Sequence, residues 1–406
     1  MNFHLYEKAS ARGKSVRDFL ALEHNMLVLL GALLVIGMGE ELWVRFMPKY
    51  LEALGAGAIA IGLYGSFKKI VDAVYQYPGG GLADKLGRKR ALTLFNIIAA
   101  CGYLLYLLTS RWEWVIAFTL LVMAWSSMSQ PAIFALIGDT LSRSKRAMGF
   151  SVQSIWKRVP IVIAPPLGGY LLARWGLVPG MHAGFGVALL FALVAIYLQS
   201  RFYRSAPPSR DAQRVRINHI WHLVPGALRR LLLADCLVRF GSNLAAIYVV
   251  LWVINVHGKT PLEFGALTSL QMIVAIAGYL PAAYLADRWG RQPFVLATFA
   301  FFTLFPLSLI VLPSRWLFPA FVVAGLREIG EPARKARIVD LAEETRRGRI
   351  VGLYYLIRGM VTIPAPLLGG LLWRYGASWP FILGGVVSGL GLVLYAVKPQ
   401  LSGQMA

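Results

Sequence analysis

The chain contains little charge, little cysteine and few acidic residues. Of its 406 residues only 15% are charged, two are cysteines, and 19 acidic residues stand against 41 basic ones. With 57% hydrophobic residues, this composition excludes an ordinary water-soluble globular fold. Cys101 and Cys236 both lie in apolar stretches, which gives no sign of a disulfide framework. The composition instead predicts a protein that lies in a lipid bilayer.

Sequence signals of an enzyme or of a nucleic-acid-binding protein are also missing. No phosphate-binding Gly-rich loop with Lys-Ser/Thr occurs, and the six histidines are dispersed rather than grouped with cysteines as metal ligands. Only His219 and His222 lie close together, in a basic stretch that we assign to the membrane surface. We therefore expect no catalytic activity, no cofactor, no bound metal and no nucleic-acid partner.

Long apolar stretches recur along the whole chain. A helix needs roughly 20 apolar residues to cross a hydrocarbon core about 30 Å thick, so each stretch predicts one transmembrane helix. The predicted spans are 25–47, 57–78, 91–109, 114–137, 147–172, 181–199, 231–256, 262–284, 294–312, 316–338, 349–373 and 378–397. We thus predict an all-α integral membrane protein with twelve transmembrane helices.

Basic residues are distributed unevenly between the predicted loops. Most lie in the amino-terminal segment, in the loops after even-numbered spans and at the carboxyl terminus. The loops after odd-numbered spans hold only Lys49, Arg111, Arg174, Lys259, Arg315 and Arg374. Because basic loops stay on the cytoplasmic side, both termini are predicted to be cytoplasmic, in a plasma membrane of the bacterial inner-membrane type.

A polar, basic stretch divides the chain into two halves of six spans each. This stretch is too short for a domain, and its charge predicts a linker that lies against the anionic inner leaflet. The predicted organisation is a cytoplasmic segment 1–24, a helical bundle 25–199, the linker 200–230, a second bundle 231–397 and a cytoplasmic tail 398–406.

The two halves repeat each other. The loop at 80–89, GGLADKLGRK, returns in weakened form as AYLADRWGRQ at 283–292, and the aspartates of the two copies lie 203 positions apart. Other residues match at a distance of 201 positions, namely Asp139 with Asp340, Pro165 with Pro366 and Gly168 with Gly369. Such matches indicate an internal duplication, so we predict two pseudo-symmetric six-helix bundles.

The first loop resembles the motif Gly-x-x-x-Asp-Arg/Lys-x-Gly-Arg-Arg/Lys, which the major facilitator superfamily carries between its second and third helices. Together with twelve spans and a central linker, this resemblance extends over essentially the whole chain. It implies a secondary active transporter in which two bundles rock about a midplane site, and a loop that sets the balance between inward-facing and outward-facing states. The predicted gating residues are Gly80, Asp84, Gly87, Arg88, Asp287, Gly290 and Arg291.

The fifth span contains residues 164–169, APPLGG, which are similar to a Gly-Pro-x-x-Gly-Gly pattern that the family associates with antiporters. Here Ala164 replaces the leading glycine. Proline kinks and small residues also explain such a stretch by close helix packing alone. An arginine-containing motif in the fourth span would resemble the proton-coupled drug antiporters of the family, but residues 114–137 contain no basic residue. The sequence therefore allows both an antiporter and a symporter.

Ionisable residues inside the spans indicate the substrate, because one such group at the bilayer centre costs roughly 2.5–3.5 kcal/mol and needs a partner or a water-filled cavity. The third, sixth, ninth and twelfth spans contain none, and the resemblance places these four outside the cavity. Spacing of three or four residues predicts local pairs between Glu41 and Arg45, Lys68 and Asp72, Asp235 and Arg239, and Arg327 and Glu331. The other charges are mostly basic, which suits an anionic group. Predicted substrate-binding residues are Lys69, Lys157, Arg158, Arg327, Arg358, Glu40 and Glu328.

Carboxylates in the same spans are candidates for proton coupling. They are Glu40, Glu41, Asp72, Glu328 and Glu331. Burial and nearby bases act on their proton affinity in opposite directions, and a permanently ionised structural network is the alternative interpretation.

We predict a monomeric, proton-coupled transporter of a small anionic or zwitterionic organic solute. One alternative within the same class is a multidrug or organic-cation/proton antiporter that uses Glu40, Glu41 or Asp72. Alternatives of another class are a lipid translocator and a non-transporting membrane sensor on the same scaffold.

Overall fold

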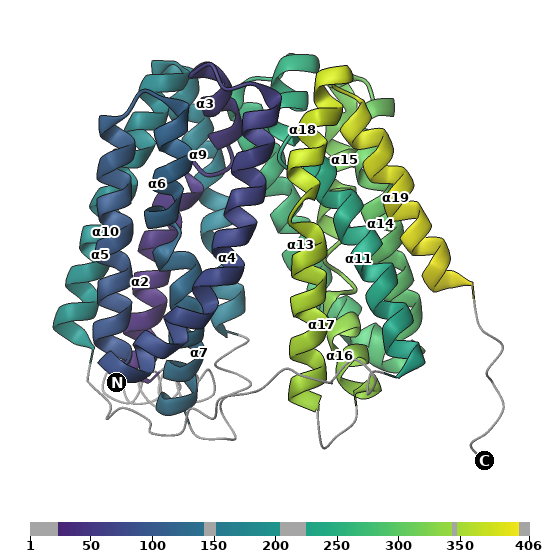
Figure 1. Ribbon diagram of the computed structural model, residues 1–406, viewed down its shortest axis with the longest axis horizontal. Coiled ribbons are helices and arrows are strands. Elements are labelled where there is room, and N and C mark those ends of the chain that lie inside the picture. The colour runs from purple at the N-terminus through teal and green to yellow at the C-terminus, as the bar shows by residue number, and fades with distance from the viewer. Residues whose placement is uncertain (1–22, 142–151, 204–224, 343–346, 398–406) are drawn as a thin grey trace, which may run out of the picture. The chain divides into compact units, whose positions relative to one another are not determined.

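The computed structural model describes residues 23–141, 152–203, 225–342 and 347–397. These residues form helices joined by short turns, with no strand among them. The first half contains α2 (His24–Glu41), α3 (Met47–Ala53), α4 (Ala58–Leu86), α5 (Arg88–Leu108), α6 (Trp112–Val122), the π-helix η1 (Ala124–Met128), α7 (Ser129–Thr140), α9 (Val159–Trp175) and α10 (Leu177–Phe202). Helical segments therefore lie at all six predicted spans of this half (Figure 1).

The second half follows the same plan. It contains α11 (Gly226–Ala246), α12 (Val249–Leu251), the π-helix η3 (Trp252–Val256), α13 (Pro261–Trp289), α14 (Arg291–Val311), the 3₁₀ turn η4 (Ser314–Trp316), α15 (Leu317–Leu326), α16 (Glu331–Leu341), α17 (Arg347–Thr362), α18 (Ala365–Tyr375) and α19 (Trp379–Ala396). Both halves together give the predicted all-α fold.

Among the described residues, eight helical segments are long and apolar enough to cross a membrane by themselves. A ninth qualifies if Gly226–Ala246 and Val249–Val256, which are bent by 42°, count as one span. The other predicted spans fall short for local reasons. Charged side chains interrupt the apolar run of α4, α9 has 17 described residues, and the span at 316–338 divides into α15 and α16.

The chain divides into two compact units whose boundaries differ from those of the predicted bundles. One unit consists of Met1–Met47 and Ile70–Gln213, and the other of Pro48–Lys69 and Arg214–Ala406. We call Pro48–Lys69 the inserted segment. It contains α3 and the first part of α4, and it packs with the second half of the chain although its neighbours on both sides belong to the first unit.

Close backbone contacts hold the inserted segment in the second unit. The Tyr248 hydroxyl lies 3.1 Å from the Ala58 carbonyl oxygen and 3.0 Å from that of Pro366, so it donates to one of them at a time. A Cβ atom on Gly62 would lie 2.6 Å from the Pro366 oxygen. Glycine is therefore needed for this close approach.

A polar clasp of Lys49, Glu52 and Asn255 lies at the start of the inserted segment. Lys49 Nζ donates to Glu52 Oε2 at 2.5 Å and also contacts the side-chain oxygen of Asn255. The Asn255 amide in turn donates to Glu52 Oε1 at 2.8 Å. The three side chains thus join α3 to η3 by a closed ring of contacts.

Two repeat-related glycines let helices touch within each unit. A Cβ on Gly168 of α9 would collide with the carbonyl oxygen of Leu42, and a Cβ on Gly369 of α18 would collide with that of Leu244. The duplicated small residues therefore serve close helix packing, whatever else they do.

Glycines also make the two repeated loops possible. Gly87 between α4 and α5 has a φ of 81°, and Gly290 between α13 and α14 has a φ of 89°. Residues with a Cβ rarely adopt such values, so glycine permits the abrupt change of direction in both copies.

Candidate substrate-binding residues and gating loops

Three predicted spans break at the positions of their ionisable residues. α2 ends at Glu41 and a turn at 42–46 follows, Arg158 precedes α9 in a turn, and residues 327–330 form the turn between α15 and α16. Helix ends leave backbone groups unpaired, and discontinuous helices are a frequent source of substrate and ion sites in transporters. The breaks therefore mark where a site can be built.

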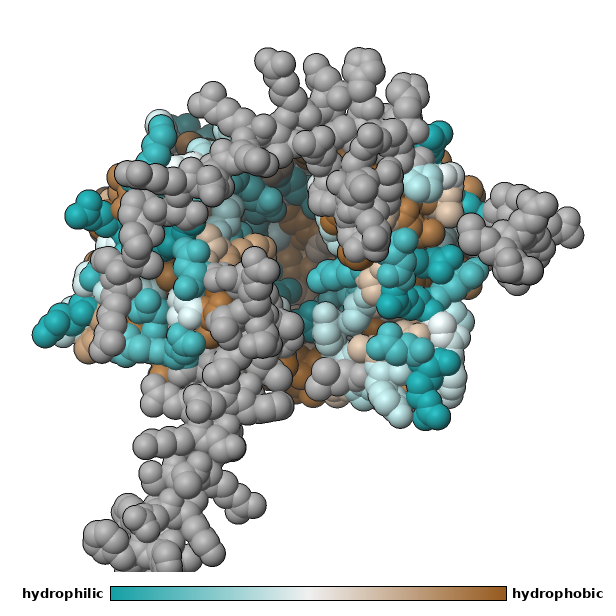
Figure 2. Space-filling model, turned by 90° about the horizontal axis from the view of Figure 1, so that it is seen from below, coloured by the Kyte–Doolittle hydropathy of each residue, from teal (hydrophilic) through white to brown (hydrophobic). Residues whose placement is uncertain are grey.

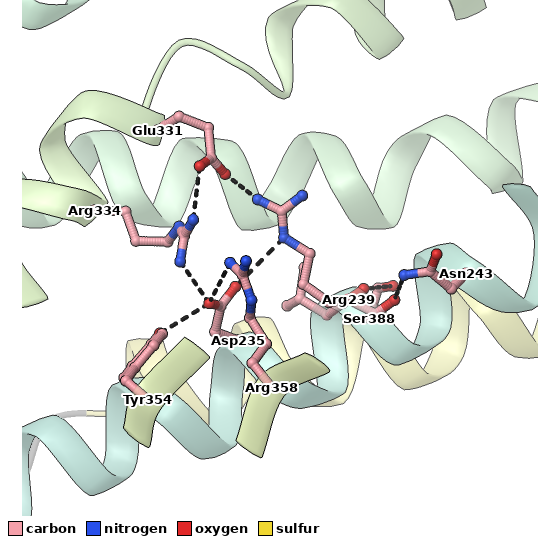
Figure 3. A network of polar contacts seen from close by, with 9 residues as sticks. Asp235, Arg239, Asn243, Glu331, Arg334, Tyr354, Arg358 and Ser388 are labelled. Atoms are coloured by element: carbon pink, nitrogen blue, oxygen red, sulfur yellow. Dashed lines mark hydrogen bonds and ion pairs between the residues drawn. The ribbon is translucent and has the colours of Figure 1, made fainter. Parts of the chain in front are cut away.

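In the second unit, Asp235 of α11 is the centre of a buried polar network (Figure 3). Its side chain is 0% exposed. Its Oδ2 accepts hydrogen bonds from Arg334 at 2.6 Å, from the Tyr354 hydroxyl at 2.8 Å and from Arg358 at 3.4 Å. Its Oδ1 lies 3.6 Å from Nε of Arg239, one helical turn away. One carboxylate thus contacts three arginines from three helices.

Glu331, the first residue of α16, is the second acid of the network. Its Oε2 accepts a hydrogen bond from Arg334 at 2.6 Å, and its Oε1 contacts Arg239. The carboxylate lies at the amino-terminal, partly positive end of a helix, which stabilises its charge. Arg334 lies between Asp235 and Glu331 with 1% of its side chain exposed, so this buried cation has two anionic partners.

Arg239 and Arg358 have hydrogen-bond donors that the network does not use. A guanidinium group has five N–H donors, whereas within the described residues Arg358 makes one hydrogen bond and Arg239 makes one, with a second contact at 3.6 Å. Their side chains are 22% and 23% exposed. The network contains three arginines and two carboxylates, so it has one surplus positive charge. Arg239 and Arg358 are its partly exposed arginines.

Aromatic rings orient the arginines of this region. The guanidinium carbon of Arg327 lies 4.4 Å from the ring centroid of Phe305 and 5.0 Å from that of Phe302. Arg239 lies 4.4 Å from the same Phe302 ring. Stacking occupies the face of a guanidinium group and leaves its N–H edge available. Arg327 and Arg239 thus share the ring of Phe302, while the guanidinium carbon of Arg358 lies 4.7 Å from the ring centroid of Tyr355.

Two of the predicted local pairs are confirmed. Arg45 Nε donates to Glu41 Oε2 at 3.0 Å, and Arg239 forms its ion pair with Asp235 at 3.6 Å. Asp235 and Arg239 both lie in α11, where helix geometry fixes their distance, whereas Arg45 reaches Glu41 from the turn at 42–46.

The other two predicted pairs are wrong. Asp72 does not pair with Lys68 but accepts a hydrogen bond from the Ser127 hydroxyl of η1 at 2.7 Å. Glu331 does not pair with Arg327, because the turn at 327–330 interrupts the helix and Glu331 binds the two arginines of the network instead. The assumed helical spacing does not exist across this break.

The remaining candidates are divided between the units. Lys69 ends the inserted segment and belongs to the second unit, together with Glu328 in the turn before α16. Glu40, the exposed Lys157 and the half-buried Arg158 belong to the first unit. Each unit therefore carries its own set of ionisable candidates.

In the first unit, an aromatic cluster lies one turn from Glu40. The Trp43 ring meets Tyr103, Tyr106 and Phe185 edge-on, with centroid distances of 5.9, 5.7 and 5.4 Å. The Glu40 carboxylate lies within electrostatic reach of the Tyr103 hydroxyl. A carboxylate beside electron-rich rings is an arrangement that suits an organic cation.

Arg334 and Tyr354 are absent from the predicted site, and Asp235 appears there only with its local partner. Asp235 and Arg334 lie 99 residues apart, so no sequence spacing reveals their contact. A weaker signal exists nevertheless. Arg334 follows Glu331 by three residues and Tyr354 precedes Arg358 by four, which places both on the charged faces of their helices.

The two predicted gating loops make corresponding contacts. Arg88 donates to Asp84 at 2.5 Å and to Asp139, at the end of α7, at 3.3 Å. In the second copy Arg291 contacts Asp340, at the end of α16. Asp139 and Asp340 are repeat counterparts, so each unit ties its loop arginine to the equivalent helix. The gating role of these residues remains a prediction.

Comparisons with known proteins agree with this architecture. The family model described as Major Facilitator Superfamily matches residues 29–235 and 231–403. The uncharacterized MFS-type transporter MJ1317 of Methanocaldococcus jannaschii is 21% identical over 88% of this chain and 91% of its own length. The class B tetracycline resistance protein of Escherichia coli is 22% identical over 91% of this chain and 92% of its own.

Solved structures show the same fold. A bacterial homologue of the human lysosomal transporter Spinster, in an inward-facing and occupied conformation, has a TM-score of 0.75 and 15% identity, and the match covers 91% of this chain and 95% of that one. The human organic anion transporter MFSD10 has a TM-score of 0.61 and 16% identity, with 92% and 99% covered.

The family match extends over most of the chain. The structure agrees with this match in its duplicated helices, its repeated loops and the charges at its helix breaks. This chain belongs to the major facilitator superfamily and is a multi-pass membrane transporter.

Proposed function

We propose that the protein is a secondary active transporter that moves a small organic solute with an anionic group, zwitterions included, by alternating access. It acts in the bacterial inner membrane with both termini in the cytoplasm. One observation carries the proposal: Arg239 and Arg358 are partly exposed and keep unused donors, at the edge of a buried network with one surplus positive charge.

An anionic group on the solute would complete this network. Guanidinium groups bind carboxylates and phosphates with two parallel hydrogen bonds, which gives orientation as well as attraction. The ring of Phe302 already fixes the face of Arg239, so its N–H edge is preorganised for such a contact. Asp235 and Arg334 are too deeply buried to take part directly, and they position the two exposed arginines.

Proton coupling is the second part of the proposal, with Glu40 and Glu328 as proton carriers. Glu40 lies in the last turn of α2, and Glu328 lies two residues after α15 ends. The carboxyl-terminal end of a helix carries partial negative charge, which disfavours a further negative charge there.

The test uses Arg358→Gln, with Arg288→Gln as the matched control because Arg288 is exposed and contacts Tyr284 rather than the network. Thermal unfolding of the purified protein is measured against organic anions, organic cations and neutral sugars at two pH values. We expect stabilisation by one or more anions, about tenfold weaker apparent affinity in Arg358→Gln, and no change in Arg288→Gln.

Unchanged anion affinity in Arg358→Gln would exclude the network as the binding site. Protection by cations alone would favour the second candidate function, an organic-cation/proton antiporter. That candidate rests on Glu40 beside the aromatic cluster of Trp43, and on curated relatives named for multidrug and tetracycline resistance.

A further inference from the structure

A second cationic cluster lies in the second unit, outside the network of Figure 3. It consists of Arg230 of α11, Arg337 of α16 and Tyr395 of α19, and both guanidinium groups lie within electrostatic reach of the Tyr395 hydroxyl. Arg230 Nε donates to the carbonyl oxygen of Leu394 at 2.8 Å, which ties it to the last turn of α19. Three helices therefore contribute to one basic site, which we call the Arg230–Arg337–Tyr395 cluster.

Two donors of this cluster, on Arg337 and Tyr395, lack an acceptor among the described residues. Among the residues that the structure describes, none forms an ion pair with Arg337, and its Nε is buried without a hydrogen bond. The Tyr395 hydroxyl is buried beside Arg337, on a side chain that is 7% exposed, and it donates to no acceptor among the described residues. The next acid along α16, Asp340, is already bound to Arg291. Buried polar groups in native proteins are almost always satisfied, so these donors call for an acceptor from outside the described chain.

The surroundings of the cluster point to a lipid. Arg230 lies in the first turns of α11, whereas Arg337 and Tyr395 lie in the last turns of α16 and α19, so all three lie near predicted cytoplasmic segments. Figure 2 views the molecule from below, and hydrophilic side chains gather on that face. Leu233 on α11 and Val393 on α19 are exposed apolar side chains within one turn of the cluster. The donors thus lie where polar headgroups meet hydrocarbon.

We propose that the Arg230–Arg337–Tyr395 cluster binds the phosphate of an anionic phospholipid from the inner leaflet. Phosphate oxygens accept hydrogen bonds from both guanidinium groups and from the tyrosine hydroxyl. The acyl chains lie against the apolar surface around Leu233 and Val393. A soluble phosphate shares the headgroup chemistry but gains nothing from that apolar surface, so the lipid is the favoured ligand.

The experiment compares full-length wild-type protein with Arg337→Gln and Tyr395→Phe. Each is purified in a mild detergent and titrated with phosphatidylglycerol or phosphatidylcholine, and the unfolding temperature and the number of bound lipids by native mass spectrometry are recorded. We expect phosphatidylglycerol to stabilise the wild type, with about tenfold weaker apparent affinity in both variants. Arg288→Gln, which changes an exposed base elsewhere in the unit, retains wild-type affinity.

Tyr395→Phe keeps the test sound if Arg337→Gln does not fold, because phenylalanine preserves the edge-on contact with Phe299 at 5.4 Å. Equal affinity of wild type and both variants for phosphatidylglycerol would overturn the proposal. Full protection by inorganic phosphate or glycerol 3-phosphate would assign the site to a soluble anion and overturn the lipid assignment. Solute binding at Arg358 is measured in a separate experiment. A negative result for the lipid therefore does not refute the solute site, and a negative result for the solute does not refute the lipid site.

Discussion

Arg334 is a cation that solvent does not reach. Its guanidinium group lies between the carboxylates of Asp235 and Glu331, at 2.6 Å from each. Burial removes the hydration of all three charges, so each depends on the others for its stability. The same two carboxylates contact Arg239 and Arg358 on their outer side. Arg334 therefore acts as a positioning residue, and it touches no part of the solute in the proposed complex.

We expect Arg334→Gln to lower the free energy of unfolding by about 3–5 kcal/mol, because the change leaves two buried carboxylates with too few partners. Denaturant unfolding in detergent measures the effect. Adding Asp235→Asn to Arg334→Gln removes one of the stranded charges, so the double variant should recover part of the loss. Arg315→Gln, in the exposed turn η4, serves as the control and should change stability by less than about 0.5 kcal/mol. A loss no larger than that of the control would show that the network is dispensable for folding.

At the scale of helices, packing in each unit depends on where a Cβ is missing. Gly168 of α9 and Gly369 of α18 lie against carbonyl oxygens of the neighbouring helix. Gly186 of α10 has open space around its Cβ position. All three are helical, so alanine should favour the helix itself by roughly 1 kcal/mol at each position. Only the local space distinguishes them.

Gly168→Ala should therefore destabilise the protein by about 1–3 kcal/mol, because the added methyl group forces α9 away from Leu42. Gly186→Ala should be neutral or slightly stabilising. The unfolding temperatures of the two variants, measured under identical conditions, provide the comparison. If Gly168→Ala behaves like Gly186→Ala, close helix contact is not what this glycine provides.

The helices themselves are largely predictable from the sequence, because a bilayer requires long apolar stretches and these are visible without any tertiary information. A local pair such as Asp235 with Arg239 follows from helical spacing. The breaks are different. The apolar run of 316–338 ends at Leu326, and Gly330 with Pro332 follows, but a prediction of one continuous span does not use this signal. The predicted pair of Arg327 with Glu331 fails because the helix stops at residues 327–330.

The polar network is predictable only in part. The sequence identifies Arg358 and Asp235 as candidate functional residues because they are charges within apolar spans. Their contact depends on the rotation and tilt of α11 and α17 about their axes, which packing of many side chains decides together. Two residues 123 positions apart leave no periodic signal of such a contact.

At the scale of the whole molecule, the inserted segment is fastened by the clasp of Lys49, Glu52 and Asn255. Alternating access requires contacts at one end of a carrier to open while those at the other end close. A cysteine pair at the clasp tests whether it takes part. Glu52→Cys with Asn255→Cys replaces side chains that lie 2.8 Å apart, in a background where the exposed Cys101 is serine.

Oxidation of this pair should stop solute transport in proteoliposomes, and dithiothreitol should restore it, because the disulfide keeps α3 attached to η3. Each single cysteine variant should transport at the same rate with and without oxidant. Transport at the full rate by the oxidised pair, with the crosslink verified by mass spectrometry, would remove the clasp from the transport cycle.

The inserted segment also sets the order in which the protein can be assembled during its synthesis. Ala58 contacts Tyr248, which the ribosome adds 190 positions later, and the Ser66 hydroxyl contacts the backbone of Leu367, which is added 301 positions later. At roughly 5–20 residues per second this is a wait of roughly 15–60 seconds. During that interval Gly62 and its neighbours have no native partner. The part of α4 before Ile70 is thus made before its partners in the second unit exist, and it packs only after the second half has entered the membrane.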